Sequence, residues 1–186
     1  RYRAAYFWEE RNRWFSDVWE GITGELQALE DDDLRDRSAA FPFEIPYRLV
    51  NMYSVYGDTV LDPFWGTGTT SLAAMVAGRN SVGCEIDAAL ARAFDERAGE
   101  APATSRAVAR RRLADHRAFV RERREAGETF EYEADHYDVP VTTNQERRLR
   151  LYAVERVEET ADGYRAVHEP VDDAALGGGG GGGGGG

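Results

Sequence analysis

A glycine-rich segment carries the clearest chemical pattern in this 186-residue sequence. It reads Asp62-Pro-Phe-Trp-Gly-Thr-Gly-Thr-Thr70 and follows a short apolar run at 59–61. Gly66 and Gly68 would let the backbone approach a ligand closely, because glycine has no Cβ. A helix beginning after the glycines would add unpaired N–H donors and the positive end of its dipole, which suit a ligand carboxylate. The alternative is a tight structural turn without a ligand.

An acidic residue follows the glycines at a spacing that nucleoside-binding folds use. Glu85 lies near the end of a second apolar run, 81–86, and comes 19 positions after Gly66. A carboxylate at a strand end can accept hydrogen bonds from both hydroxyls of a ribose. Taken alone, Glu85 could also be an ordinary surface carboxylate. Together the turn and the acid predict a nucleoside-containing cofactor, and they leave nicotinamide and S-adenosylmethionine cofactors both open.

The elements that would position these residues form a βαβ unit. Helices are expected at 71–77 and 88–97, next to strands at 59–61 and 81–86. Such a unit makes the strands parallel and packs helices on the sheet, so the expected fold class is α/β with a partial Rossmann-like sheet. Before the unit, residues 41–46 are expected to be extended, since each residue before a proline is disfavoured in a helix, and 47–56 to be helical.

The second half of the chain differs in character. Residues 103–126 are rich in arginine and alanine and predict one long exposed helix or two shorter ones. Strands are expected at 130–137 and 149–157, and a turn at 161–163 predicts a hairpin with 164–167. The expected organisation is therefore a cofactor-binding part at 1–99, an α+β extension of unknown role at 100–172 and a flexible glycine tail at 173–186.

The composition is acidic and contains no lysine. Twenty-three arginines face 34 acidic residues, for a net charge of −11. Such a charge weighs against a nucleic-acid partner, but high salt shortens the range of the repulsion, and the composition fits a halophilic cytoplasm. No apolar stretch approaches the length of a membrane span, and Cys84 has no second cysteine to pair with. We expect a soluble cytoplasmic protein with Cys84 buried in its strand.

Several stretches together resemble a known family, the N4-cytosine/N6-adenine DNA methyltransferases. The stretches are Phe41-Pro-Phe-Glu-Ile-Pro-Tyr-Arg-Leu-Val50, the glycine segment with its strand, Ala77-Gly-Arg79 and Gly83-Cys-Glu-Ile-Asp87. Asp17-Val-Trp19 is similar to a stretch found upstream in that family, so the resemblance covers roughly residues 11–95. It is closest to the class in which the cofactor half follows the catalytic half, and it selects S-adenosylmethionine as the cofactor and DNA as the partner.

The resemblance also implies roles for individual residues. Phe41 and Phe43 would lie by the methionine and adenine portions of the cofactor, Glu85 would bind the ribose, and Ile86 would pack on the adenine ring. The turn itself would be lined by Asp62, Phe64, Gly66, Gly68, Thr69 and Thr70. No metal ligand is implied; His136 between Asp135 and Asp138 is only a faint metal pattern.

The sequence departs from the family in its catalytic motif. The family uses an Asp/Ser/Asn-Pro-Pro-aromatic tetrapeptide that holds the flipped-out base, and no Pro-Pro pair occurs here. Because that motif precedes the cofactor motif in this class, and the chain opens on Arg1, we expect the catalytic half to be missing or on a separate subunit, and assign no catalytic residue. The alternatives are a catalytically empty cofactor-binding fragment and an RNA guanine methyltransferase.

Two further groups of side chains have both a functional and a structural interpretation. The aromatic residues between Tyr6 and Trp19 could stack on bases, but core packing is the favoured interpretation. The arginines from Arg106 to Arg124 could contact phosphate, but the acidic residues interleaved with them favour a solvated helix face with i,i+4 ion pairs.

Overall fold

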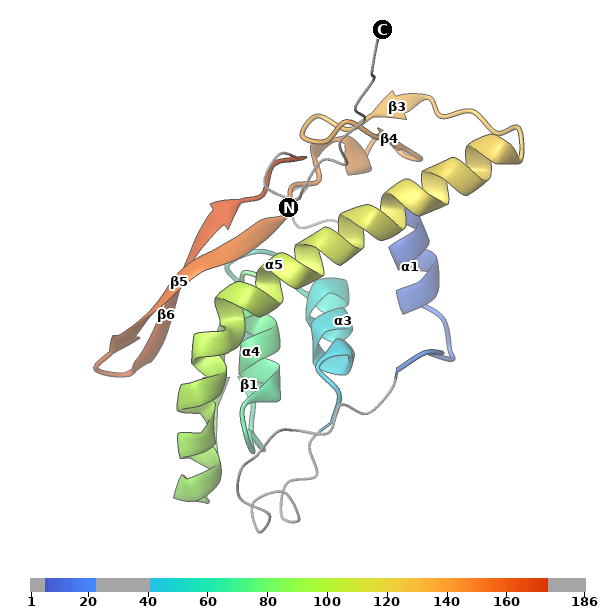
Figure 1. Ribbon diagram of the computed structural model, residues 1–186. Coiled ribbons are helices and arrows are strands. Elements are labelled where there is room, and N and C mark those ends of the chain that lie inside the picture. The colour runs from blue at the N-terminus through green and yellow to red at the C-terminus, as the bar shows by residue number, and fades with distance from the viewer. Residues whose placement is uncertain (1–5, 23–40, 174–186) are drawn as a thin grey trace, which may run out of the picture.

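The computed structural model describes residues 6–22 and 41–173 of the chain (Figure 1). The glycine tail expected at 173–186 lies outside these residues, apart from Asp173. In the described part, a short parallel sheet and three helices stand beside a long diagonal helix, and a β-hairpin lies along the same long helix (Figure 1).

The βαβ unit is present as expected. Strand β1 (Thr59–Asp62) is followed by helix α4 (Thr69–Val76) and strand β2 (Asn80–Gly83). The strands are parallel, and their register runs from Thr59 opposite Asn80 to Asp62 opposite Gly83. Both strands therefore end at the same edge of the sheet, where the glycine segment begins. The α/β fold class is confirmed.

Helix α3 (Glu44–Tyr53) begins earlier than expected. The sequence predicted extended structure for residues 41–46, yet Glu44, Ile45 and Pro46 form the first turn of the helix. A proline is tolerated there because the first N–H groups of a helix have no intrahelical partner. The prediction was wrong because a proline only disfavours the helical conformation of the residue before it. In α3 the residue before Pro46 is helical despite this preference.

Helix α5 (Ala88–Glu125) is one 38-residue helix where a break near Gly99 was expected. It begins at Asp87, whose side chain accepts a hydrogen bond from the N–H of Ala89 at 2.9 Å. Figure 1 shows that α5 bends in its first half, and an internal proline, here Pro102, is the usual cause of such a kink. Helix α5 runs through residues 99 and 100 without interruption. The division of the chain into a cofactor-binding part at 1–99 and an extension at 100–172 stays a prediction.

The C-terminal part begins with two short strands, where a longer strand was expected at 130–137, and continues with a regular hairpin. Strands β3 (Tyr132–Glu133) and β4 (Pro140–Val141) form a small antiparallel pair, and the 3-10 helix η2 (Glu146–Arg148) follows. The hairpin comprises β5 (Tyr152–Thr160) and β6 (Gly163–Pro170), joined at the predicted turn. It packs along α5 and adds Val154 to the core beneath α4.

Helix α1 (Trp8–Trp14) is attached to α5 by aromatic and charged side chains. Phe7 and Trp14 are fully buried, which confirms core packing for these two aromatic residues. Glu10 is buried with them and receives two hydrogen bonds from Arg112, at 2.6 Å and 2.7 Å. This doubly bonded pair lets two charges lie inside the protein, since each neutralises the other.

One side of the two-stranded sheet has no helix on it in the described part of the chain. Leu61 of β1 and Val82 of β2 are 65% and 52% exposed, although apolar residues in parallel strands are normally covered on both faces. Cys84, which was expected to be buried, is exposed, because β2 ends at Gly83 on this uncovered side. None of the helices in the described ranges combines the length and apolar character needed to cross a membrane.

Candidate cofactor site

The glycine segment is fastened to the ends of both strands by backbone hydrogen bonds. The N–H of Cys84 donates to the carbonyl of Asp62 at 2.9 Å, and the N–H of Trp65 donates to the carbonyl of Cys84 at 3.0 Å. The Asp62 carboxylate accepts the N–H of Phe64 at 3.0 Å. These bonds extend the parallel pairing past Gly83 and fix where the turn leaves the sheet.

Glu85 reaches from the end of β2 to the glycine turn. Its Oε2 accepts the N–H of Gly66 at 2.7 Å, and its Oε1 accepts the N–H groups of Ile86 and Asp87, both at 2.9 Å. Donation by the N–H of Asp87, and then by those of Gly66 and Ile86, lowers the pKa of Glu85 below its ordinary range. The carboxylate is therefore ionised near neutral pH, and it ties together two segments 19 residues apart in the sequence.

Glycine is favoured at the two positions of the turn for different structural reasons. Both adopt the left-handed backbone that favours glycine, with φ of 56° at Gly66 and 78° at Gly68. A Cβ on Gly66 would meet no atom within 4 Å, whereas a Cβ on Gly68 would lie 2.3 Å from Cδ2 of Phe94. Gly68 is therefore needed for packing against α5, while the space above Gly66 is open.

Helix α4 begins directly after Gly68 and has no side-chain N-cap. Its first N–H groups therefore have no capping side chain, as a helix end that receives an anion would require. The Thr69 side chain is buried, and its hydroxyl accepts a hydrogen bond from Arg97 at 2.9 Å, whereas Thr70 is half-buried. Arg97 also donates to the hydroxyl of Thr67 at 2.9 Å. One side chain of α5 therefore binds the residues on both sides of Gly68.

Three of the predicted cofactor residues expose large apolar side chains. Phe64 is 88% exposed and Ile86 is completely exposed, on the two loops that follow β1 and β2. Phe41, on the segment before α3, is 42% exposed. Large apolar side chains at the ends of parallel strands are typical of a binding site for a flat ring, because they lose solvent contact only when a ligand covers them.

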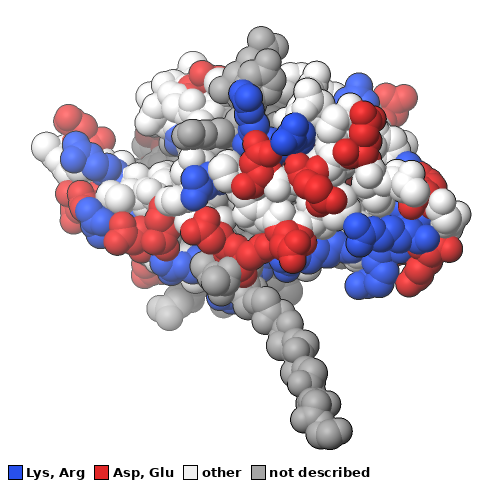
Figure 2. Space-filling view, turned by 90° about the horizontal axis from the view of Figure 1, so that it is seen from above, with Lys and Arg blue, Asp and Glu red and all other residues white. Residues whose placement is uncertain are grey.

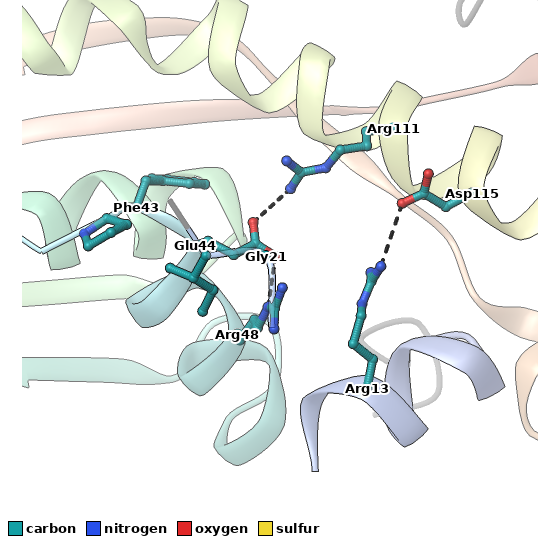
Figure 3. Close-up of a pocket in the computed structure, with 9 residues that line it drawn as sticks. Arg13, Gly21, Phe43, Glu44, Arg48, Arg111 and Asp115 are labelled. Carbon is teal, nitrogen blue, oxygen red and sulfur yellow. Dashed lines mark hydrogen bonds and ion pairs between the residues drawn. The ribbon is translucent and has the colours of Figure 1, made fainter. Parts of the chain in front are cut away.

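Phe43 lies in a different environment from the glycine turn. Its ring stacks on Tyr47 with centroids 5.4 Å apart, and it lines a pocket of about 230 Å³ between α1, α3 and α5. Figure 3 shows this pocket, in which Arg48 and Arg111 both bind Glu44 and Arg13 faces Asp115. The residues that line this pocket include none from the glycine turn, so Phe43 is not brought together with Gly66 and Glu85 by a shared cavity.

The sequence did not identify the side chains that support the turn from behind. Phe94 packs on Trp65 with ring centroids 4.8 Å apart and on Tyr164 of β6 at 5.7 Å. Trp65 also lies over Gly83, where a Cβ would come within 2.3 Å of its ring, and donates to the Ser71 hydroxyl at 2.7 Å. No motif marks these residues, since each contact joins segments distant in the sequence. The hairpin of the extension thus packs, through Tyr164, on the Phe94 ring that contacts the turn.

Taken together, a strand-end acid bound to a glycine turn at the start of a helix defines the class of nucleotide- and nucleoside-cofactor α/β proteins. The comparisons with known proteins narrow this class. The sequence profile of the DNA methylase family matches residues 1–96. The chain belongs to this family of DNA methylases.

Two type II methyltransferases are similar to this chain, one over most of its length and the other over about half. The type II methyltransferase M.MthZI of Methanothermobacter thermautotrophicus is 50% identical over 152 residues, which cover 82% of this chain and 41% of that protein. The type II methyltransferase M.MjaI of Methanocaldococcus jannaschii is 52% identical over 99 residues, covering 53% of this chain and 32% of that protein. The matched residues thus cover less than half the length of each of these relatives.

A solved structure is also similar in part. TTHA0409 of Thermus thermophilus, solved in complex with S-adenosyl-L-methionine, is 39% identical. The similarity covers 51% of this chain and 34% of that one, with a TM-score of 0.43.

Proposed function

We propose that this chain is the cofactor-binding part of a DNA methyltransferase that transfers a methyl group from S-adenosylmethionine to N6 of adenine or N4 of cytosine. Membership of the DNA methylase family supports this assignment. The observation that carries it is the 2.7 Å hydrogen bond between Gly66 and Glu85, which assembles a nucleoside-binding constellation from two loops. Type II methyltransferases among the relatives also support a place in a restriction–modification or genome-marking system.

The residues at this edge of the sheet fit the parts of S-adenosylmethionine. Phe64 and Ile86, both exposed, would enclose the adenine ring, and the uncapped start of α4 would face the methionine carboxylate. Glu85 would hold the ribose. Because backbone N–H groups already use three of the roughly four acceptor positions of its carboxylate, the ribose would share or displace one of these bonds. Phe41 would complete the methionine side of the site.

When bound, this cofactor supplies an electrophilic methyl group on a sulfonium centre. The described residues would bind and orient it, but they include no group placed to hold the acceptor base. We propose that a Pro-Pro tetrapeptide outside these 186 residues, in the same polypeptide or in a partner subunit, supplies that function, since the sequence contains no Pro-Pro pair. The composition supports the further proposal that the protein works at high salt.

Calorimetric titration with S-adenosylmethionine tests the site. Gly66→Val should abolish binding, because its side chain would fill the open space above the turn where the ligand would approach. Gly57→Val is the matched control: Gly57 also has a positive φ, 85°, and open space around its Cβ, but it precedes β1 at the opposite end of the strand. Unchanged affinity in Gly66→Val, or equal losses in the two variants, would show that the site is wrongly placed.

Methyl transfer by this chain gives a second test. We expect no transfer to DNA by the 186-residue chain alone, although it binds the cofactor. Robust transfer in a tritiated-methyl assay would contradict the proposal that the base-holding tetrapeptide lies elsewhere.

A further inference from the structure

Five arginines lie along one side of α5, and we call them the arginine row: Arg106, Arg110, Arg117, Arg121 and Arg124. At 3.6 residues per turn, these positions fall within an arc of about 60° around the helix. They extend over about 27 Å at the helical rise of 1.5 Å per residue. The row thus forms a narrow, straight line of guanidinium groups on a chain whose net charge is −11.

The ion pairs of α5 differ from the pattern that the sequence favoured. Interleaved acids predicted i,i+4 pairs along the helix, but no ion pair joins two residues of α5 within the part of the chain that the structure describes. Arg106 pairs instead with Glu169 of β6 at 3.4 Å, and Arg117 with Asp173 at 2.7 Å. Arg110, Arg121 and Arg124 have no ion pair among the described residues and are exposed.

The acidic residues of the same part of α5 point mostly to another side. By helical geometry, Asp115 and Glu122 lie more than about 130° from the centre of the row, and Glu125 borders it at about 75°. A hollow of about 450 Å³ lies between α5 and the segment from Asp138 to Pro140, lined by Arg117, Arg121 and Arg124 and also by the acidic Glu125 and Asp138. Figure 2 shows basic side chains gathered toward the right-hand end of the molecule, the end at which α5 finishes in Figure 1.

We propose that the arginine row binds the phosphate backbone of double-stranded DNA. The choice of DNA as partner rests on the proposed function; the row itself rests on the geometry of α5. From Arg110 to Arg124 the row spans about 21 Å, which corresponds to about six base pairs at 3.4 Å per pair. Exposed arginines suit this role because the planar guanidinium donates to two phosphate oxygens at once.

Fluorescence anisotropy with a labelled duplex of about 20 base pairs, longer than the row, tests the proposal across a series of salt concentrations. The test variant replaces the three unpaired arginines, Arg110, Arg121 and Arg124, by glutamine. We expect its affinity for the duplex to fall about tenfold or more, and the slope of log K against log salt to become shallower by about 2 to 3. The corresponding triple lysine variant should keep most of the affinity, because it keeps the charge.

The control for net charge replaces three exposed arginines outside α5, Arg147, Arg156 and Arg165, by glutamine. Unlike the three row arginines of the test variant, Arg147 pairs with Asp135, and Arg156 pairs with Glu155 and Glu158. The control variant should keep the affinity and the salt slope of the unaltered chain. Equal losses in the two triple variants would overturn the proposal, as would an unaltered chain without salt-dependent duplex binding. A different outcome is that the unaltered chain binds single-stranded DNA or RNA more tightly than the duplex and that the row variant loses this binding. This outcome would show that double-stranded DNA is the wrong partner.

Calorimetry with S-adenosylmethionine on the same preparations separates this proposal from the proposed function. The row variant should bind the cofactor as the unaltered chain does, since the row lies away from the glycine turn along α5. A chain that binds duplex through the row but binds no S-adenosylmethionine would overturn the cofactor assignment alone. Normal cofactor binding together with row-independent DNA binding would overturn the row alone.

Discussion

Replacing Gly68 by alanine should destabilise the fold much more than the same change at Gly66. Both residues have a positive φ, so each alanine would be strained by about 1–2 kcal/mol from the left-handed backbone alone. At Gly66 the new methyl group meets open space. At Gly68 it would lie 2.3 Å from the Phe94 ring, well inside the roughly 3.5–4.0 Å at which carbon atoms normally pack.

The Phe94 ring has little room to move away. It is 3% exposed and lies between Trp65 and Tyr164. Forcing an extra carbon into such a packed contact costs about 1–3 kcal/mol. The free energy of unfolding should therefore fall by about 2–5 kcal/mol in Gly68→Ala, against about 1–2 kcal/mol in Gly66→Ala.

Urea unfolding followed by far-ultraviolet circular dichroism measures both differences. The double variant Gly68→Ala/Phe94→Leu isolates the steric part, because the smaller side chain removes the ring atoms that the new methyl group meets. Its loss of stability should be smaller than the sum of the two single losses by about 1–3 kcal/mol. If Gly68→Ala does not fold, recovery of folding in the double variant reports the same contact. Additive single effects, or equal losses at Gly66 and Gly68, would refute this account of the turn.

Two further predictions concern charged side chains. Backbone N–H groups lower the pKa of Glu85, so its ionised form stabilises the fold above its ordinary pKa of 4.5, and this stability is lost as the pH falls through the lowered value. Glu85→Gln should therefore flatten the acid side of a stability-versus-pH curve, and an unchanged curve would contradict this role of the carboxylate. Glu10→Gln should lower the free energy of unfolding by about 3–5 kcal/mol, because Arg112 stays buried without its counter-charge, and Glu10→Leu/Arg112→Met should lose much less; a small loss in Glu10→Gln would contradict the role given to the pair.

Local pattern was sufficient where neighbours in the sequence are also neighbours in space. The apolar runs, the glycine segment and the acid 19 residues later predicted the βαβ unit, because a strand, a tight turn and a helix each depend mainly on their own residues. The hairpin at 161–163 was predicted for the same reason. Local preferences failed at Pro46, which was expected in an extended segment and lies in the first turn of α3. They failed also between the helices expected at 88–97 and 103–126, where α5 continues through Pro102.

The support of the candidate site is a tertiary property. Phe94 and Arg97 come from the helix after β2, and Tyr164 comes from the hairpin, so their contacts with the turn join segments that no spacing rule connects. The hairpin of the extension, whose role the sequence left open, therefore contacts Phe94, the residue that packs against the glycine turn. Cys84 shows the opposite effect: a strand-like apolar run predicts burial, but exposure depends on what covers the sheet.

The sequence by itself determined the α/β class, the glycine turn and the family, because these depend on residue types at short, fixed spacings. Only the tertiary structure decided that Glu85 bonds to Gly66, that Gly68 must be small because of Phe94, and that three arginines of α5 lack acidic partners among the described residues. The physical reason is the same in each case. A hydrogen bond, a steric contact or an ion pair depends on distance in space, and that distance is set by how separate helices and strands pack together.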